Sequence, residues 1–145
     1  MLLSDILSKI HHAGCANFEE TDITDVECHS KKCTAKSIFV CINGRKDKGE
    51  AYIDEARRNG TRVFVVEESS KVDFLKNETV IFSKNARKTL AEISKSLYLL
   101  KTCDLTFVGI SGTKGKTTTA VCLAKILEES GVQTLQIGTF GISFY

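Results

Sequence analysis

The segment from Phe107 to Thr119 constrains the fold of this chain more than any other. An apolar run there leads into a glycine-rich turn closed by Gly115-Lys116-Thr117. In such a turn, between a strand and a helix, successive backbone N–H groups converge on a phosphate, a lysine reaches the outer phosphates and a hydroxyl ligates Mg²⁺. We predict a phosphate loop with Lys116 as its catalytic residue and Thr117 as its metal ligand. Its members are Gly112, Thr113, Lys114, Gly115, Lys116, Thr117 and Thr118.

The residues around this loop predict the beginning of a parallel sheet. Leu105 to Ile110 has the pattern of a strand, Lys116 to Glu129 that of a helix, and Thr134 to Ile137 that of a further strand. This strand-loop-helix-strand order implies parallel pairing through a right-handed crossover. Parallel strands need helices over both faces, so residues 103–145 are expected to be the incomplete start of a domain. Residues 138–145 should then fold back on the first domain, pair with another chain or stay loose.

Residues 1–102 are predicted to form a separate small α/β domain. Strands are expected at 37–42, 62–67 and 79–82, and helices at 51–59 and 85–100. A short amphipathic helix marked by Leu3, Ile6, Leu7 and Ile10 is expected at the start. Ser4 would be its N-cap, and His11 and His12 would follow its C-terminal end.

Composition excludes several classes of protein. The net charge of the 145 residues is +2, and the basic residues are spread along the chain, which gives no warrant for nucleic-acid binding. The first residues resemble neither a signal peptide nor a membrane span, so a cytoplasmic location without a membrane partner is the default expectation.

The six cysteines form no C-x-x-C pair and are expected to be free thiols. Cys28, His29 and Cys33 come nearest to a metal cluster, but strand and loop positions explain them better. Cys41 and Cys122 lie in apolar stretches and are predicted to be core residues.

The loop departs from the strict G-x-x-x-x-G-K-[ST] pattern, because Ile110 occupies the place of the first glycine. Residues 112–118, GTKGKTT, resemble instead the GT-[NK]-GKTT loop of the Mur ligases and folylpolyglutamate synthetases. Further pieces are similar to the UDP-N-acetylmuramyl-tripeptide synthetases, the MurE type of that family. They are HSK at 29–31 for D-S-R, FVCING at 39–44 for F-V-A-x-x-G, KGEAYIDEA at 48–56 for D-G-x-x-[FY]-I-x-x-A, GTRVFVVE at 60–67 for G-A-x-x-V-V-x-E, and IGTFG at 137–141 for G-T-x-G.

This resemblance implies an ATP-dependent carboxylate-amine ligase of peptidoglycan synthesis, and with it a role in cell shape and division. ATP and Mg²⁺ would be the cofactors. A carboxylate of a UDP-N-acetylmuramoyl-peptide would become an acyl phosphate, which the amine of an amino acid attacks. The fold implied is α/β: a small UDP-binding-type domain, then the truncated start of a parallel-sheet ATPase domain.

The resemblance also implies where the nucleotide-sugar would lie. Cys28 and Ser30 would meet the uracil or ribose of UDP, and Arg45, Lys46 and Asp47 would line the loop facing it. The family's second carboxylate for Mg²⁺, its carbamylated lysine and its amino-acid site would all lie beyond Tyr145. A chain of this extent is therefore expected to be inactive alone.

Two alternatives remain open at this point. One is another ligase of the Mur or folylpolyglutamate type with a different substrate. The other is a nucleotide-binding regulatory module that is complete at this length and uses the loop as a sensor.

Overall fold

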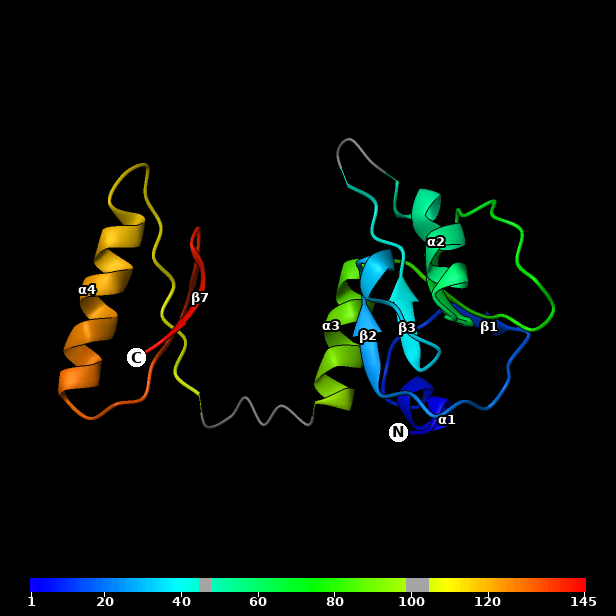
Figure 1. Ribbon diagram of the computed structural model, residues 1–145, viewed down its shortest axis with the longest axis horizontal. Coiled ribbons are helices and arrows are strands. Elements are labelled where there is room, and N and C mark those ends of the chain that lie inside the picture. Colours follow the sequence, from blue (N-terminus) through cyan, green and yellow to red (C-terminus); the bar gives the residue numbers. More distant parts are fainter. Residues whose placement is uncertain (45–47, 99–104) are drawn as a thin grey trace. The chain divides into compact units, whose positions relative to one another are not determined.

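The computed structural model describes residues 1–44, 48–98 and 105–145, and these form two compact units (Figure 1). The first unit runs from Met1 to Lys101 and the second from Thr102 to Tyr145. The boundary expected after residue 102 falls outside the described residues. None of the helices in the described ranges combines the length and the apolar character needed to cross a bilayer.

The first unit is built on a five-stranded sheet in the order β1-β5-β4-β3-β2. Strands β2 to β5 pair in parallel, and only β1 runs antiparallel, against β5. The strands are β1 (Gly14–Ala16), β2 (Asp25–Glu27), β3 (Ser37–Val40), β4 (Val63–Glu67) and β5 (Thr79–Ser83). The helices are α1 (Leu3–Leu7), η1 (Ser30–Lys32), η2 (Gly49–Tyr52), α2 (Ile53–Arg58) and α3 (Ala86–Leu97).

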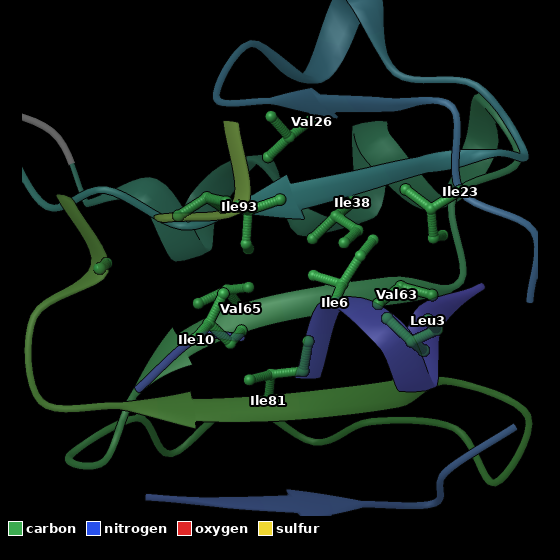
Figure 2. Packing of buried hydrophobic residues seen from close by; sticks show 12 residues of the cluster. Leu3, Ile6, Ile10, Ile23, Val26, Ile38, Val63, Val65, Ile81 and Ile93 are labelled. Carbon is green, nitrogen blue, oxygen red and sulfur yellow. The ribbon is translucent and has the colours of Figure 1, made fainter. Parts of the chain in front are cut away.

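Alternate side chains of the central strands point to opposite faces of the sheet, as the period of two requires. One face carries Ile38, Val40, Val63, Val65 and Ile81 and is covered by α1 and α3. Figure 2 shows Leu3 and Ile6 of α1, and Ile93 of α3, pointing among these strand residues. This is the larger of two cores in the unit.

The opposite face carries Phe39, Phe64, Val66 and Val80 and is covered by α2 and by the segment after β4. Ile53 and Ala56 are the buried residues of α2 in this layer. Because both faces are covered, β3 and β4 read as continuous apolar runs rather than alternating ones. The first unit is thus a three-layer α/β sandwich.

The second unit holds the helix α4 (Lys116–Glu129) and a hairpin of β6 (Leu135–Gly138) and β7 (Gly141–Phe144). β6 and β7 pair antiparallel, with Leu135 opposite Phe144 and Gly138 opposite Gly141. Within residues 105–145 only Ala124 is buried.

Most of the predicted elements of the first unit are confirmed. The expected strands at 37–42, 62–67 and 79–82 correspond to β3, β4 and β5, and the expected helix at 85–100 corresponds to α3 over the described residues. The helix expected at 51–59 is split, with a 3-10 turn (η2) before α2. Ser4 is not an N-cap, because α1 begins at Leu3 and ends at Leu7; His11 pairs with Glu92 instead of lying at a helix end.

In the second unit, the helix at 116–129 is confirmed, but the parallel arrangement is wrong. Leu105 to Ile110 is not a strand, because no neighbouring strand in residues 105–145 offers it a hydrogen-bonded partner. Gly138 to Tyr145 is not loose: the turn at Gly141, with φ of 95°, returns β7 onto β6. Cys122 is exposed rather than buried, since the side of α4 that carries it is uncovered.

Candidate functional site

The predicted phosphate loop lies directly before α4. Gly115 is the N-cap residue of this helix, with φ of 78° and ψ of −6°, a left-handed conformation that favours glycine. The helix begins at Lys116, whose Nζ donates a hydrogen bond of 2.7 Å to the carbonyl oxygen of Gly112. The carbonyl of Gly115 accepts from the N–H of Thr119 at 2.9 Å. The lysine therefore folds back over the glycine-rich turn, and its ammonium lies at the N-terminus of a 14-residue helix.

The chemistry of this loop fits a phosphate group. The first N–H groups of α4 have no partner within the helix, and they and the helix dipole favour a negative charge at this end. Gly112 to Lys116 are exposed, Thr117 is half-buried, and a Cβ built on Gly115 meets no atom within 4 Å. The backbone is thus open to a ligand on the side where the lysine lies.

For a metal ion, the same loop supplies hydroxyl groups, with Thr117 as the predicted ligand, and no carboxylate. The acidic residues described in 105–145 are Glu128 and Glu129, at the other end of α4. A Mg²⁺ ion bound here would take its other ligands from phosphate oxygens and water, as this ion often does.

The residues predicted to contact UDP lie in the first unit, at the carboxyl end of β2. Cys28 follows that strand and is exposed, whereas Ser30 begins η1 and is buried. The Ser30 hydroxyl donates a short hydrogen bond to Glu55, and the Ser30 carbonyl accepts one of 2.8 Å from Asn59. The Ser30 side chain is therefore held in place by α2 rather than free to turn toward solvent.

Arg45, Lys46 and Asp47 lie outside the described residues, but the two ends of their loop are well defined. Gly49 packs so closely on the chain after β3 that a Cβ there would lie 2.6 Å from the nitrogen of Ile42. The Asn43 side chain accepts from the N–H of Gly49 at 3.2 Å and donates to Glu67 at 3.2 Å. These contacts place the base of the loop at the carboxyl end of β3, beside that of β2.

The sequence analysis missed the residues that support this edge. Glu55 and Asn59 are four residues apart, so they share one side of α2, and both bind Ser30. Nothing in the sequence predicted which element that side of the helix would face. Gly49 could have been found from the sequence, because the family motif D-G-x-x-[FY]-I-x-x-A, which residues 48–56 match, has a glycine at the same position.

The cysteine cluster is not a metal centre in the described part of the chain. Cys33 is buried in the core beside Phe39, while Cys28 and His29 are exposed, and no group of three possible ligands occurs among the described residues. Cys41 is a core residue as predicted, and burial raises the pKa of its thiol to about 12. The five cysteines in the described ranges are free thiols.

Sequence comparison links the chain to ligases of one kind. Residues 22–98 match the family described as Mur ligase family, catalytic domain. The chain is 31% identical over 139 residues to the UDP-N-acetylmuramoyl-L-alanyl-D-glutamate--2,6-diaminopimelate ligase of Clostridium perfringens (strain 13 / Type A), which covers 96% of this chain and 28% of that protein. It is 34% identical over 126 residues to the protein of the same name from Bacillus velezensis, covering 87% of this chain and 25% of the relative.

Solved structures agree with this match. The crystal structure of MurF from Acinetobacter baumannii superposes with a TM-score of 0.58 at 20% identity over 77% of this chain and 23% of that one, a likeness of fold. The MurF ligase of Thermotoga maritima in complex with ADP gives a TM-score of 0.52 at 26% identity over 72% of this chain and 23% of that one. The chain thus spans only 25% to 28% of the two ligases that it matches in sequence. This chain therefore belongs to the Mur ligase family, because the family matches residues 22–98, ligase relatives align along almost the whole chain, and the fold is shared.

Proposed function

We propose that this chain is the N-terminal part of an ATP-dependent ligase that adds an amino acid to a UDP-N-acetylmuramoyl-dipeptide through an acyl phosphate. The observation that carries the proposal is the GTKGKTT turn at the N-terminus of α4, joined to a separate α/β unit within one Mur ligase chain. Relatives that align with both parts share a name that ends in diaminopimelate ligase. That name supports the dipeptide as the acceptor.

In this proposal the loop binds the triphosphate of ATP. ATP, when bound with Mg²⁺, supplies the phosphoryl group that activates the substrate carboxylate. The first N–H groups of α4 and the ammonium of Lys116 hold the phosphate oxygens and offset the negative charge that moves during transfer. Thr117 offers its hydroxyl to the metal. These groups are fixed before the nucleotide binds, because Gly115 already begins the helix in its left-handed conformation.

The first unit holds the UDP of the acceptor in this proposal. Cys28 lies exposed at the carboxyl end of β2, where ligands of open parallel sheets bind. Ser30 contacts UDP from its fixed position on η1. Arg45, Lys46 and Asp47 contribute charge to the binding of UDP from the loop whose base lies at the carboxyl end of β3. A nucleotide diphosphate has two phosphates for those basic side chains to neutralise.

We expect a protein of this extent to bind nucleotides without completing the ligation. Residues 105–145 hold no acidic side chain near the loop that could join Thr117 as a ligand of Mg²⁺. In this proposal the site for the amino acid belongs to the remainder of the ligase, since this chain covers 28% of its relative from Clostridium perfringens. Activity is therefore a property of a longer protein.

A second candidate is a ligase of the same group with another acceptor. The likeness of fold to two MurF structures favours it, since these superpose on 77% and 72% of this chain. The two candidates predict the same nucleotide sites and differ in the peptide acceptor.

Titration of the chain with MgADP by calorimetry tests the proposal. Lys116→Ala should weaken binding at least about tenfold, since an ammonium–phosphate contact of roughly 1.5–3 kcal/mol is lost. Lys125→Ala, on an exposed part of the same helix, is the matched control and should bind as the original chain does. Equal affinity in all three proteins would refute the role of the loop.

A separate titration with UDP tests the first unit. Mutation of Arg45 and Lys46 together to alanine should weaken binding, whereas mutation of Lys71 and Lys76, two exposed lysines of the segment after β4, should not. An absence of UDP binding by the original chain at millimolar ligand would contradict the assignment of that unit while leaving the ADP result intact.

A further inference from the structure

A cavity lies in the first unit at the carboxyl ends of β4 and β5. Its volume is about 570 Å³, within the usual range of small-molecule sites. It is lined by the turn before β1, by Glu68 after β4, by the chain from Ser83 to Asn85 after β5, and by Lys88 and Thr89 of α3. The sheet order β1-β5-β4-β3-β2 separates it from Cys28 and Ser30, because these follow β2, which lies two strands, or about 10 Å, from β4.

The cavity occupies a place where connections of the sheet diverge. The segment after β4 passes over the face that carries Phe64, since Val72 and Phe74 pack there, whereas the chain after β5 leads to α3 on the other face. Where the loops after two neighbouring strands turn to opposite faces of the sheet, a crevice opens at the carboxyl ends of those strands. Ligands of open α/β sheets bind in such crevices. The antiparallel β1 closes one side, since the N–H of Ala13 donates to the carbonyl of Phe82 at 2.7 Å.

The cavity is lined by more basic side chains than acidic ones. Lys84, Lys88, His11 and His12 line it, against one acidic lining residue, Glu68. Glu92 is already engaged by His11, which donates its N–H at 2.8 Å and places Nδ1 3.0 Å from the carboxylate; Lys88 lies 3.9 Å from the same group. Among the described residues, neither Lys84 nor His12 forms an ion pair.

The cationic residues that line the cavity are lysines, and no arginine occurs among its described lining residues. Lysines act as point charges and are common phosphate binders. The start of α3, a 12-residue helix capped by Asn85, adds its positive end to the same space.

We propose that this cavity binds a phosphate-bearing small molecule, with Lys84 and Lys88 as its cationic contacts and His12 as a hydrogen-bonding contact. The residues that line it belong neither to the phosphate loop nor to the set proposed to hold UDP, and this binding goes beyond the ligase function. Glu68 faces the same space and limits how much negative charge the cavity accepts.

The test is a titration of the isotope-labelled chain with inorganic pyrophosphate at low ionic strength, followed by NMR. The amides of His12, Lys84 and Asn85 should shift and saturate. The K84A/K88A double variant should bind about tenfold more weakly, and Glu68→Gln should bind about threefold more tightly, because each removes a charge facing the ligand. K71A/K76A, which removes two exposed lysines elsewhere, is the matched control and should leave the dissociation constant unchanged.

Pyrophosphate can also bind the phosphate loop, so the amides of residues 112–117 are followed in the same spectra. Lys116→Ala should abolish their shifts and leave those of His12 and Lys84 as they were. All substituted residues are exposed, and unchanged signals from β3 and β4 would show that each variant is folded. The proposal is overturned if the cavity amides do not saturate, or if K84A/K88A binds as tightly as the original chain.

Discussion

Gly49 shows how the absence of one side chain allows two stretches of backbone, one before and one after residues 45–47, to pack closely. Its Cα lies against the backbone of the chain after β3, and a Cβ would come within 2.6 to 2.8 Å of Ile42 N, Cys41 C and Ile42 O. Backbone atoms in a buried parallel sheet cannot move aside as the end of a flexible side chain can. The glycine is therefore required by the close approach and not by a turn conformation.

Gly49→Ala should destabilise the first unit by about 3 kcal/mol, in the range of overpacked cores. Gly109→Ala is the control, because a Cβ there meets no atom within 4 Å. Urea unfolding followed by circular dichroism measures both. A Gly49→Ala midpoint equal to that of Gly109→Ala would contradict the close packing.

Glu78 is a fully buried carboxylate, and Arg57 of α2 neutralises it. Its two oxygens accept from Nε and Nη2 of Arg57 at 2.7 and 2.9 Å, and one also accepts from the N–H of Leu75 at 2.9 Å. The same guanidinium lies 5.7 Å from the centre of the Phe74 ring. Arg57 thus joins α2 to the segment between β4 and β5.

Arg57→Met should cost about 3–5 kcal/mol, because it keeps the stem of the side chain and leaves a buried carboxylate without its partner. Asp54→Asn removes the other carboxylate bound to Arg57, but that side chain is 82% exposed, so the cost should stay below about 1 kcal/mol. Thermal unfolding of both variants distinguishes them. Similar melting temperatures for the two variants would contradict a larger contribution to stability from the buried Arg57–Glu78 pair.

At the scale of elements, α3 connects the sheet to the turn before β1. Its carboxylate Glu92 accepts two hydrogen bonds from His11, and the bond from the His11 N–H is the main reason why the pKa of Glu92 lies below its ordinary value of 4.5. A carboxyl group with a lowered pKa in the folded state stabilises the fold above its unfolded pKa. This stabilisation is lost as the pH falls through the folded value.

Glu92→Gln should therefore be less stable than the original chain at pH 7, and the difference should shrink as the pH falls from about 5 toward 3. Urea midpoints measured across this range give the test. Glu19→Gln, at an exposed position, serves as the control and should run parallel to the original chain. A constant difference between Glu92→Gln and the original chain would contradict the contribution of the His11 contact.

Elements were predictable from the sequence where they are long and buried on both sides. β3, β4 and α3 combine apolar runs or helical spacing with clear ends, and the sequence located all three. β1 and β2 have three residues each, and their pattern is too short to distinguish from a loop. They are strands only because a neighbouring strand supplies hydrogen bonds.

In the described part of the second unit, the lack of a neighbouring strand has the opposite effect on a segment that resembles a strand in sequence. Leu105 to Ile110 has the composition of a buried strand, yet no strand in the described residues lies beside it. The glycine turn and the start of α4 at Lys116 were predictable because they depend on the local backbone, whereas phosphate binding by this turn stays a prediction. The support of Ser30 by Glu55 and Asn59 was not, since it depends on which side of α2 faces η1.

At the scale of the whole molecule, the two units differ in how much apolar surface they bury. The first has two cores on a five-stranded sheet, whereas Ala124 is the buried residue of the second within 105–145. Phe107 and Phe144 of the second unit are 76% and 82% exposed. Since burial of apolar area drives folding, stability should be distributed unequally along the chain.

Native-state hydrogen exchange should reveal this difference. Amides of β3, β4 and β5 should exchange at least roughly a hundredfold more slowly than those in the middle of α4, because opening of the first unit exposes two cores. Ile93→Ala, which leaves a cavity under α3, should accelerate exchange in the first unit while α4 stays unchanged, since its cost of about 2–5 kcal/mol falls on one unit. If the variant accelerated exchange in α4 to the same extent, the two units would unfold together, and the phosphate loop would depend on the first unit for its structure.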